Sequence, residues 1–260
     1  MRFNLKNSVL TLGIMATGFF STSVQADEPG TANGEWHHYT GDIKGSRYSP
    51  LDQVNADNFE DLELAWSFST KNLGTRSEYK LEVTPIMVDG VLYATAGTRR
   101  TAIALDGQTG ELMWMHSMRE GLRGGMAPRQ LSGRGLSYWT DGKGDDRIYY
   151  VTTGYRLIAL NAHTGVPISS FGTDGNGILD LKIGAVQGNE VQIDLVTGEI
   201  GLHATPTIVG DMIIIGSAMK EGMTIDNYNN TKGLIRAFDI RTGKKVWQFD
   251  PIHLSGQFGN

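Results

Sequence analysis

One short pattern recurs along this chain and limits the folds that the chain can adopt. It occupies residues 104–114 and returns with the same spacing at residues 237–247. A third copy at residues 159–169 keeps the small residue, the Asx residue and the Thr-Gly pair, and lacks only the final tryptophan. Repetition of this kind is typical of architectures built from stacked units, so it constrains the fold before any single element does.

Each copy of the pattern predicts a hairpin. In the first copy an apolar run ends at Leu105, the Asp106 side chain can cap a turn, and Gly110 can take the positive φ that such a turn requires. Leu112 and Trp114 then alternate on the next strand. A tryptophan at one fixed place suggests a ring that docks on the neighbouring unit, because a single hairpin cannot bury its own faces.

Short apolar runs before each copy extend the hairpins to units of four strands, and such a unit is the blade of a β-propeller. The expected fold is therefore all-β, a partial β-propeller of about three blades. The blades are predicted at residues 83–117, 135–172 and 203–250, with inserts at residues 172–202 and 220–232.

The segment ahead of the first blade is predicted to be irregular, apart from a short helix over residues 55–64 and a strand over residues 64–68. Trp66 on this strand stands where a repeat would end. In a closed ring this strand would complete the last repeat, which is how propellers protect their edges.

The amino terminus differs from the rest of the chain. Arg2 and Lys6 precede an apolar run over residues 9–20, and small residues follow it. The run is too short to span a bilayer, so residues 1–26 are predicted to be a cleaved signal peptide and residues 27–260 to be exported to the periplasm. An uncleaved membrane anchor is the alternative.

Composition adds two constraints. The chain has no cysteine, so an exported protein of this sequence would be stabilised by packing without disulfides. Its net charge of −5 argues against a nucleic-acid surface, and no nucleic-acid partner is expected.

Taken together, the repeated pattern, the lead-in at residues 41–51 and the motif Arg134-Gly-Leu-Ser-Tyr-Trp139 resemble the amino-terminal part of a pyrroloquinoline quinone (PQQ) dehydrogenase. The resemblance implies an eight-bladed quinoprotein propeller, of which this chain would hold about three blades. The residues after Arg134, together with residues 233–239, are closest to the glucose-dehydrogenase-like branch. Methanol- and ethanol-type enzymes carry adjacent cysteines just before this arginine, and this chain has none.

The resemblance also implies a PQQ site. Glu82 matches the glutamate that approaches the quinone, and Arg134 matches the arginine that pairs with a PQQ carboxylate, which suits a planar guanidinium. The alternatives are a surface glutamate and an arginine that pairs with an unrelated acid. His203, His37 and His38 are interpreted as structural or surface groups, since no spaced third metal ligand accompanies them.

Further site residues follow from the same resemblance. Thr152 and Thr153 lie near the family's hydroxyl donor to the cofactor, and Ala218 and Met219 fall in the segment whose backbone lies along the quinone. Glu221 is the predicted metal ligand, for calcium or for another divalent or lanthanide ion, and one glutamate is only part of such a shell. A solvated glutamate in the insert is the alternative for Glu221.

The implied reaction is the oxidation of an alcohol or aldose hydroxyl, with electrons leaving to ubiquinone or a cytochrome c. The family's catalytic aspartate is expected beyond Asn260, so the chain is predicted to be an incomplete form that is inactive alone. Two other interpretations remain, a non-catalytic periplasmic propeller scaffold and a remnant that does not fold stably. Glu82 and Arg134 argue against the scaffold, which needs no clamp for a cofactor carboxylate.

Overall fold

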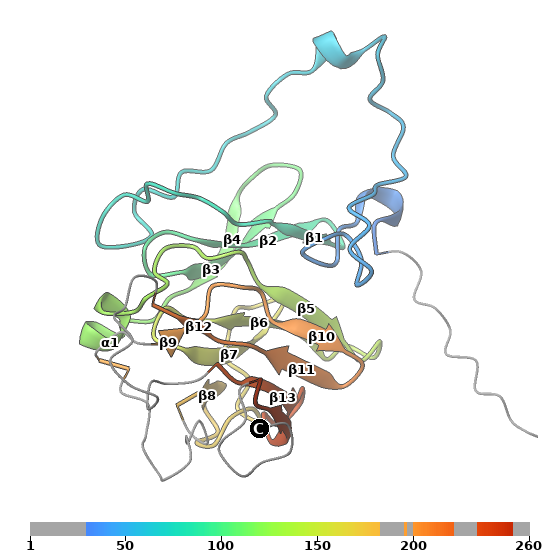
Figure 1. Cartoon of the computed structure of the whole chain (residues 1–260). Helices are drawn as coiled ribbons and strands as arrows, with labels where there is room; N and C mark the ends of the chain where they lie inside the picture. The colour runs from blue at the N-terminus through green and yellow to red at the C-terminus, as the bar shows by residue number, and fades with distance from the viewer. Residues whose placement is uncertain (1–29, 183–194, 197–199, 221–232, 252–260) are drawn as a thin grey trace, which may run out of the picture.

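In a computed structural model the chain folds into three four-stranded antiparallel sheets and one two-stranded pair (Figure 1). The structure describes residues 30–182, 195–196, 200–220 and 233–251. Within this part, no helix has the length and apolar character needed to cross a membrane. The predicted all-β, partial propeller fold is confirmed, and its sheets do not close into a ring.

The elements follow one another along the chain. Sheet 1 consists of β1 (Ile86–Val88), β2 (Val91–Ala96), β3 (Thr101–Asp106) and β4 (Leu112–His116). Sheet 2 consists of β5 (Ser137–Thr140), β6 (Asp146–Val151), β7 (Arg156–Asn161) and β8 (Ile178–Asp180). Sheet 3 consists of β10 (Thr207–Val209), β11 (Met212–Ile215), β13 (Ile235–Asp239) and β14 (Lys245–Phe249). The remaining elements are the pair β9 (Ile200–Gly201) and β12 (Ala218–Met219), the helix α1 (Gly121–Gly125), and the 3₁₀ turns η1 (Ala32–Gly34) and η2 (Phe59–Asp61).

Sheet 2 packs between the other two sheets and is apolar on both faces. On β6, Ile148 and Tyr150 belong to the core shared with sheet 1. Tyr149 and Val151 belong to the core shared with sheet 3. Because successive residues of a strand point to opposite faces, a strand that is covered on both sides carries a continuous apolar run.

The repeated tryptophan packs onto the glycine of the next unit. The indole of Trp114 covers Gly165 so closely that a Cβ there would lie 2.6 Å from a ring atom. The Nε1 of the same indole donates a hydrogen bond to the Ala162 carbonyl at 2.8 Å. Trp66 covers Gly110 in the same way, with a corresponding distance of 2.5 Å. The docking role predicted from the repeat is therefore present at both rings.

The copy without a tryptophan docks through Phe171 instead. The buried Phe171 ring lies edge-on to Tyr149, with 5.6 Å between centroids. It covers Gly243 of sheet 3, where a Cβ would lie 3.2 Å from the ring. The aromatic group lost at Ser169 is thus replaced slightly later in the chain. The chain then loops back, so the outer strand β8 lies beyond residue 172, where the second blade was expected to end.

The predicted turn chemistry is confirmed in all three copies. Asp106 Oδ1 accepts hydrogen bonds from the Thr109 backbone N–H at 2.7 Å and from the Thr109 hydroxyl at 3.0 Å. Asn161 and Asp239 accept the equivalent bonds in the second and third copies. The glycines that follow have φ values of 73°, 68° and 75°, a region that residues with a Cβ rarely adopt.

Two local predictions for the lead-in are wrong. Residues 55–64 form only the turn η2, because asparagine side chains compete with the backbone for hydrogen bonds. Asn58 accepts from the Asn55 N–H at 2.8 Å and donates to the Gln53 carbonyl at 2.8 Å. Residues 64–68 pair with no strand in the described part of the chain, although Trp66 on this segment docks as expected.

The docking contact yields a stability prediction. We expect Trp114→Ala to lower the free energy of unfolding by about 3–5 kcal/mol, because it removes a buried aromatic ring and leaves a cavity over Gly165. Met113→Ala on the same strand is the control, since Met113 is 52% exposed and should cost far less. Urea unfolding followed by fluorescence measures both, and equal losses in the two variants would contradict the docking role.

Candidate functional site

Three segments that lead into the first strand of each sheet meet at one end of the sheets. The Thr84 N–H donates to the Arg134 carbonyl at 3.1 Å, and the Arg134 N–H donates to the His203 carbonyl at 2.9 Å. These bonds bring together a group of polar side chains that we call the junction cluster. Its members are Tyr39, Lys80, Glu82, Arg134 and His203.

Glu82 is the best-connected member of the junction cluster. Its Oε2 lies 3.0 Å from His203 Nε2, and its Oε1 lies 3.0 Å from Lys80 Nζ. The hydrogen bond with His203, followed by that with Lys80, lowers the pKa of the Glu82 carboxyl from 4.5 to about 2. Glu82 is therefore a stable carboxylate held between two nitrogen groups.

Arg134 presents its guanidinium to solvent. Its Nη1 donates to the Tyr39 hydroxyl at 3.0 Å, and this bond raises the pKa of Arg134. The flanking glycines allow the three segments to pack closely. A Cβ on Gly133 would lie 3.2 Å from the His203 carbonyl oxygen, and one on Gly135 would lie 3.0 Å from the carbonyl oxygen of residue 84. Close backbone packing around Arg134 thus leaves its exposed side chain as the contact surface.

The structure places Glu82 and Arg134 in one cluster, where their roles toward a cofactor stay predictions, and it adds His203 to them. The sequence alone indicates a structural or surface histidine at His203, whereas in the structure His203 contacts the Glu82 carboxylate directly. A sequence signal was available, since Glu82-Val-Thr-Pro and His203-Ala-Thr-Pro share Thr-Pro at the same offset. The shared Thr-Pro marks equivalent positions ahead of β1 and β10.

A buried arginine ties the same segments together from the inside. Arg100 is only 2% exposed, and burial lowers its pKa to about 10. Its guanidinium donates to four backbone carbonyls, those of Leu202 at 2.6 Å, Arg129 at 2.8 Å, Val151 at 3.0 Å and Leu131 at 3.2 Å. These four hydrogen bonds stabilise the buried guanidinium, although no carboxylate contacts it.

Thr152 and Thr153 bind a different group from the junction cluster. Both hydroxyls donate to the Glu120 carboxylate, at 2.8 Å and 3.0 Å, and the Gly154 N–H donates to it at 2.6 Å. Arg156 forms an ion pair with the same carboxylate. The predicted role of these threonines as cofactor donors stays a prediction, and their hydroxyls are committed to Glu120 in this structure.

Ala218 and Met219 form the short strand β12, which pairs with β9 just before His203. Met219 is 37% exposed, and its carbonyl lies 3.4 Å from an Arg129 guanidinium nitrogen. Glu221, the predicted metal ligand, lies outside the described residues. Among the residues that are described, no group of three His, Asp or Glu side chains is placed to hold a metal ion.

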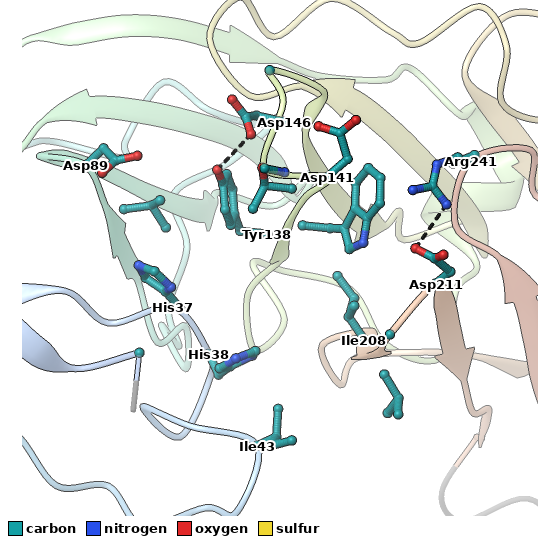
Figure 2. Close-up of a pocket in the computed structure, with 18 residues that line it drawn as sticks. His37, His38, Ile43, Asp89, Tyr138, Asp141, Asp146, Ile208, Asp211 and Arg241 are labelled. Carbon is teal, nitrogen blue, oxygen red and sulfur yellow. Dashed lines mark hydrogen bonds and ion pairs between the residues drawn. The ribbon is translucent and has the colours of Figure 1, made fainter. Parts of the chain in front are cut away.

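A pocket of about 870 Å³ lies at the opposite end of the sheets and contains none of the predicted site residues (Figure 2). Several of its polar side chains are bonded to one another. Arg241 forms an ion pair with Asp211 at 3.0 Å, and the Tyr138 hydroxyl donates to Asp146 at 3.1 Å. Size alone therefore does not make it the candidate site, and the junction cluster remains the stronger candidate.

Comparison with known proteins gives a consistent result. A PQQ family model, described as glucose/ethanol/alcohol dehydrogenase, β-propeller domain, matches residues 36–259. A quinoprotein glucose dehydrogenase of Gluconobacter oxydans is 31% identical over 86% of this chain and 28% of its own length.

Solved structures agree with these matches. A quinohemoprotein alcohol dehydrogenase from Comamonas testosteroni superposes with a TM-score of 0.62 and 27% identity, over 83% of this chain and 27% of its own. A europium-containing methanol dehydrogenase gives 0.61 and 25%, over 86% of this chain and 32% of its own. The chain thus spans about a third or less of the proteins that it matches.

The junction cluster yields a prediction about pH. Because the pKa of Glu82 is depressed on folding, its ionised form contributes stability above pH 4.5, and this contribution is lost as the pH falls through about 2. We expect His203→Ala to raise the Glu82 pKa toward 4.5, since the bond with His203 is the largest cause of the shift. An NMR titration of the Glu82 carboxyl measures this. Lys80→Ala should raise the pKa less, and an unchanged midpoint in His203→Ala would show that the contact is absent in solution.

Proposed function

This chain belongs to the PQQ glucose/ethanol/alcohol dehydrogenase family, and on that premise we propose that it supplies part of the cofactor face of a PQQ-dependent dehydrogenase. The substrate would be an alcohol or an aldose sugar. We also propose that the protein is located in the periplasm, because the apolar run of residues 9–20 is typical of an export signal. The electron acceptor would be ubiquinone or a cytochrome.

The observation that carries the proposal is the junction cluster. PQQ is a planar quinone that carries three carboxylates, so its site needs cationic and hydrogen-bonding groups on an accessible surface. The cluster offers Arg134 and Lys80, with His203 as a further donor, and the guanidinium of Arg134 is exposed. The glycines beside Arg134 let the neighbouring backbone segments pack closely beneath it, which leaves the arginine side chain at the surface. The residues of the junction cluster therefore fit PQQ.

Each residue would have a distinct task. Arg134 would bind a carboxylate through its planar fork, with Tyr39 fixing one guanidinium nitrogen. Glu82 would orient the His203 ring and the Lys80 ammonium through its two oxygens. When bound, PQQ supplies the oxidising group that accepts a hydride from the substrate carbon. The protein's share would be placement and electrostatics.

The metal belongs to the same proposal. Glu221 would donate one carboxylate to calcium or to another divalent or lanthanide ion, and such ions require several more hard oxygens. A europium-containing relative of similar fold supports a metal in the proposed site. We assign no catalytic acid or base to this chain, and we place the catalytic aspartate in the part of the family pattern that it does not span.

The second candidate is a non-catalytic propeller scaffold, which the docking repeats alone would equally suit. The two functions differ in what the junction cluster does. A scaffold has no use for an exposed arginine held between glycines beside an ionised Glu82, whereas a cofactor with carboxylates does.

Titration of the full chain with PQQ in the presence of calcium tests the proposal. We expect saturable binding, and an affinity at least about tenfold lower in Arg134→Gln, because a charge-assisted bidentate contact is lost. Arg134→Lys should recover part of the affinity, since it keeps the charge without the fork. Arg241→Gln is the control, as Arg241 lies at the opposite end of the sheets. Failure of the wild-type chain to bind PQQ would favour the scaffold.

A further inference from the structure

A second pocket, of about 290 Å³, lies between the β2–β3 turn and the loop that contains α1. It opens at the same end of the sheets as the junction cluster, since Thr153 of the β6–β7 turn also lines it. Three arginines, Arg76, Arg99 and Arg119, contribute to its wall, and we call it the arginine pocket. Its other polar lining groups are Thr75, Thr98, Glu120, Gln130 and Thr153.

The arginines of this pocket lack a counter-charge. Arg99 and Arg119 form no hydrogen bond or ion pair with any residue of the described ranges. Arg76 lies over the Tyr79 ring, with its guanidinium carbon 5.1 Å from the centroid. Glu120 is the one acid among the lining residues, and its carboxylate is already engaged by the ion pair with Arg156 and by three hydrogen bonds.

The wall of the pocket is fixed in place by interactions that do not use these arginines. Arg123 on α1 forms a bidentate pair with Asp180 of β8, with both nitrogen–oxygen distances at 2.7 Å. The α1 backbone also packs closely on the β6–β7 turn, since a Cβ on Gly124 would lie 3.2 Å from the Thr153 hydroxyl oxygen. The side of the pocket that α1 forms, next to Arg119, is therefore held in place.

We propose that the arginine pocket binds a small oxyanion, either a carboxylate of an organic acid or a phosphate. Guanidinium groups match these oxyanions geometrically, and three arginines that line one hollow, with no counter-ion among the described residues, favour an anion there. The volume is near the lower end of the range for small-molecule sites, which suits a ligand of a few heavy atoms. Thr75, Thr98 and Gln130 would supply further hydrogen bonds.

This site is separate from the junction cluster, because no member of that cluster lines the pocket, and Thr153 is the one predicted cofactor residue that does. The inference therefore does not depend on the proposed dehydrogenase function. The charged side chains at this end of the molecule therefore fall into two groups, one that is ion-paired and one that is not. Glu82 in the junction cluster is ion-paired, whereas Arg99 and Arg119 in the pocket are not.

Isothermal titration calorimetry of the full chain with inorganic phosphate, and separately with citrate, tests the proposal at constant ionic strength. We expect saturable binding of at least one of the two anions. Binding of phosphate alone would assign the site to phosphate, and binding of citrate alone would assign it to an organic carboxylate. The affinity should fall at least about tenfold in Arg99→Gln and in Arg119→Gln, since each loses a charge-assisted hydrogen bond.

Arg241→Gln is the matched control, because it removes the same charge outside the pocket, at the opposite end of the sheets. It should leave phosphate and citrate binding unchanged, just as Arg99→Gln should leave PQQ binding unchanged. Circular dichroism of each variant shows whether it is folded. If Arg99→Gln does not fold, Arg119→Gln still tests the proposal, because Arg119 is exposed. Absence of saturable binding, or an equal loss in Arg241→Gln, would overturn the proposal.

Discussion

An aromatic ring packed onto a glycine of the next unit is the contact on which this fold depends. Trp114 covers Gly165, and Phe171 covers Gly243, so sheet 1 is joined to sheet 2 and sheet 2 to sheet 3. A Cβ at Gly165 would overlap the Trp114 ring, and a Cβ at Gly243 would lie 3.2 Å from the Phe171 ring, so both rings pack most closely on glycine. The turn supplies that glycine for a second reason, its positive φ. The geometry of the turn and the packing of the sheets therefore both favour glycine at this position.

Stacking of the sheets in this way determines where the polar groups meet. The segments ahead of β1, β5 and β10 occupy equivalent places in successive sheets, so they reach the same end of the stack. Backbone hydrogen bonds between them then bring Glu82, Arg134 and His203 into one cluster. Arg100 secures the arrangement from inside by donating to carbonyls of two loops and of the end of β6. The candidate site is a consequence of how the sheets are docked.

Two groups of charged side chains at this end differ in how their charges are balanced. Glu82 is held by His203 and Lys80, which fixes the geometry of the junction cluster before any ligand arrives. Arg99 and Arg119 have no acid to balance them in the described part of the chain. A preformed set of contacts suits the recognition of a large, rigid cofactor, whereas unpaired cations suit capture of a small anion.

The sequence by itself determined the all-β propeller class, the three Asx turns, the docking tryptophans and the likeness to PQQ dehydrogenases, because each depends on residues that are close in the chain. It also paired the roles of Glu82 and Arg134 through that likeness. Only the tertiary structure joined His203 to Glu82, 121 positions away, and committed Thr152 and Thr153 to Glu120. Such pairings depend on how the sheets stack, and local patterns carry no information about which distant loops will touch.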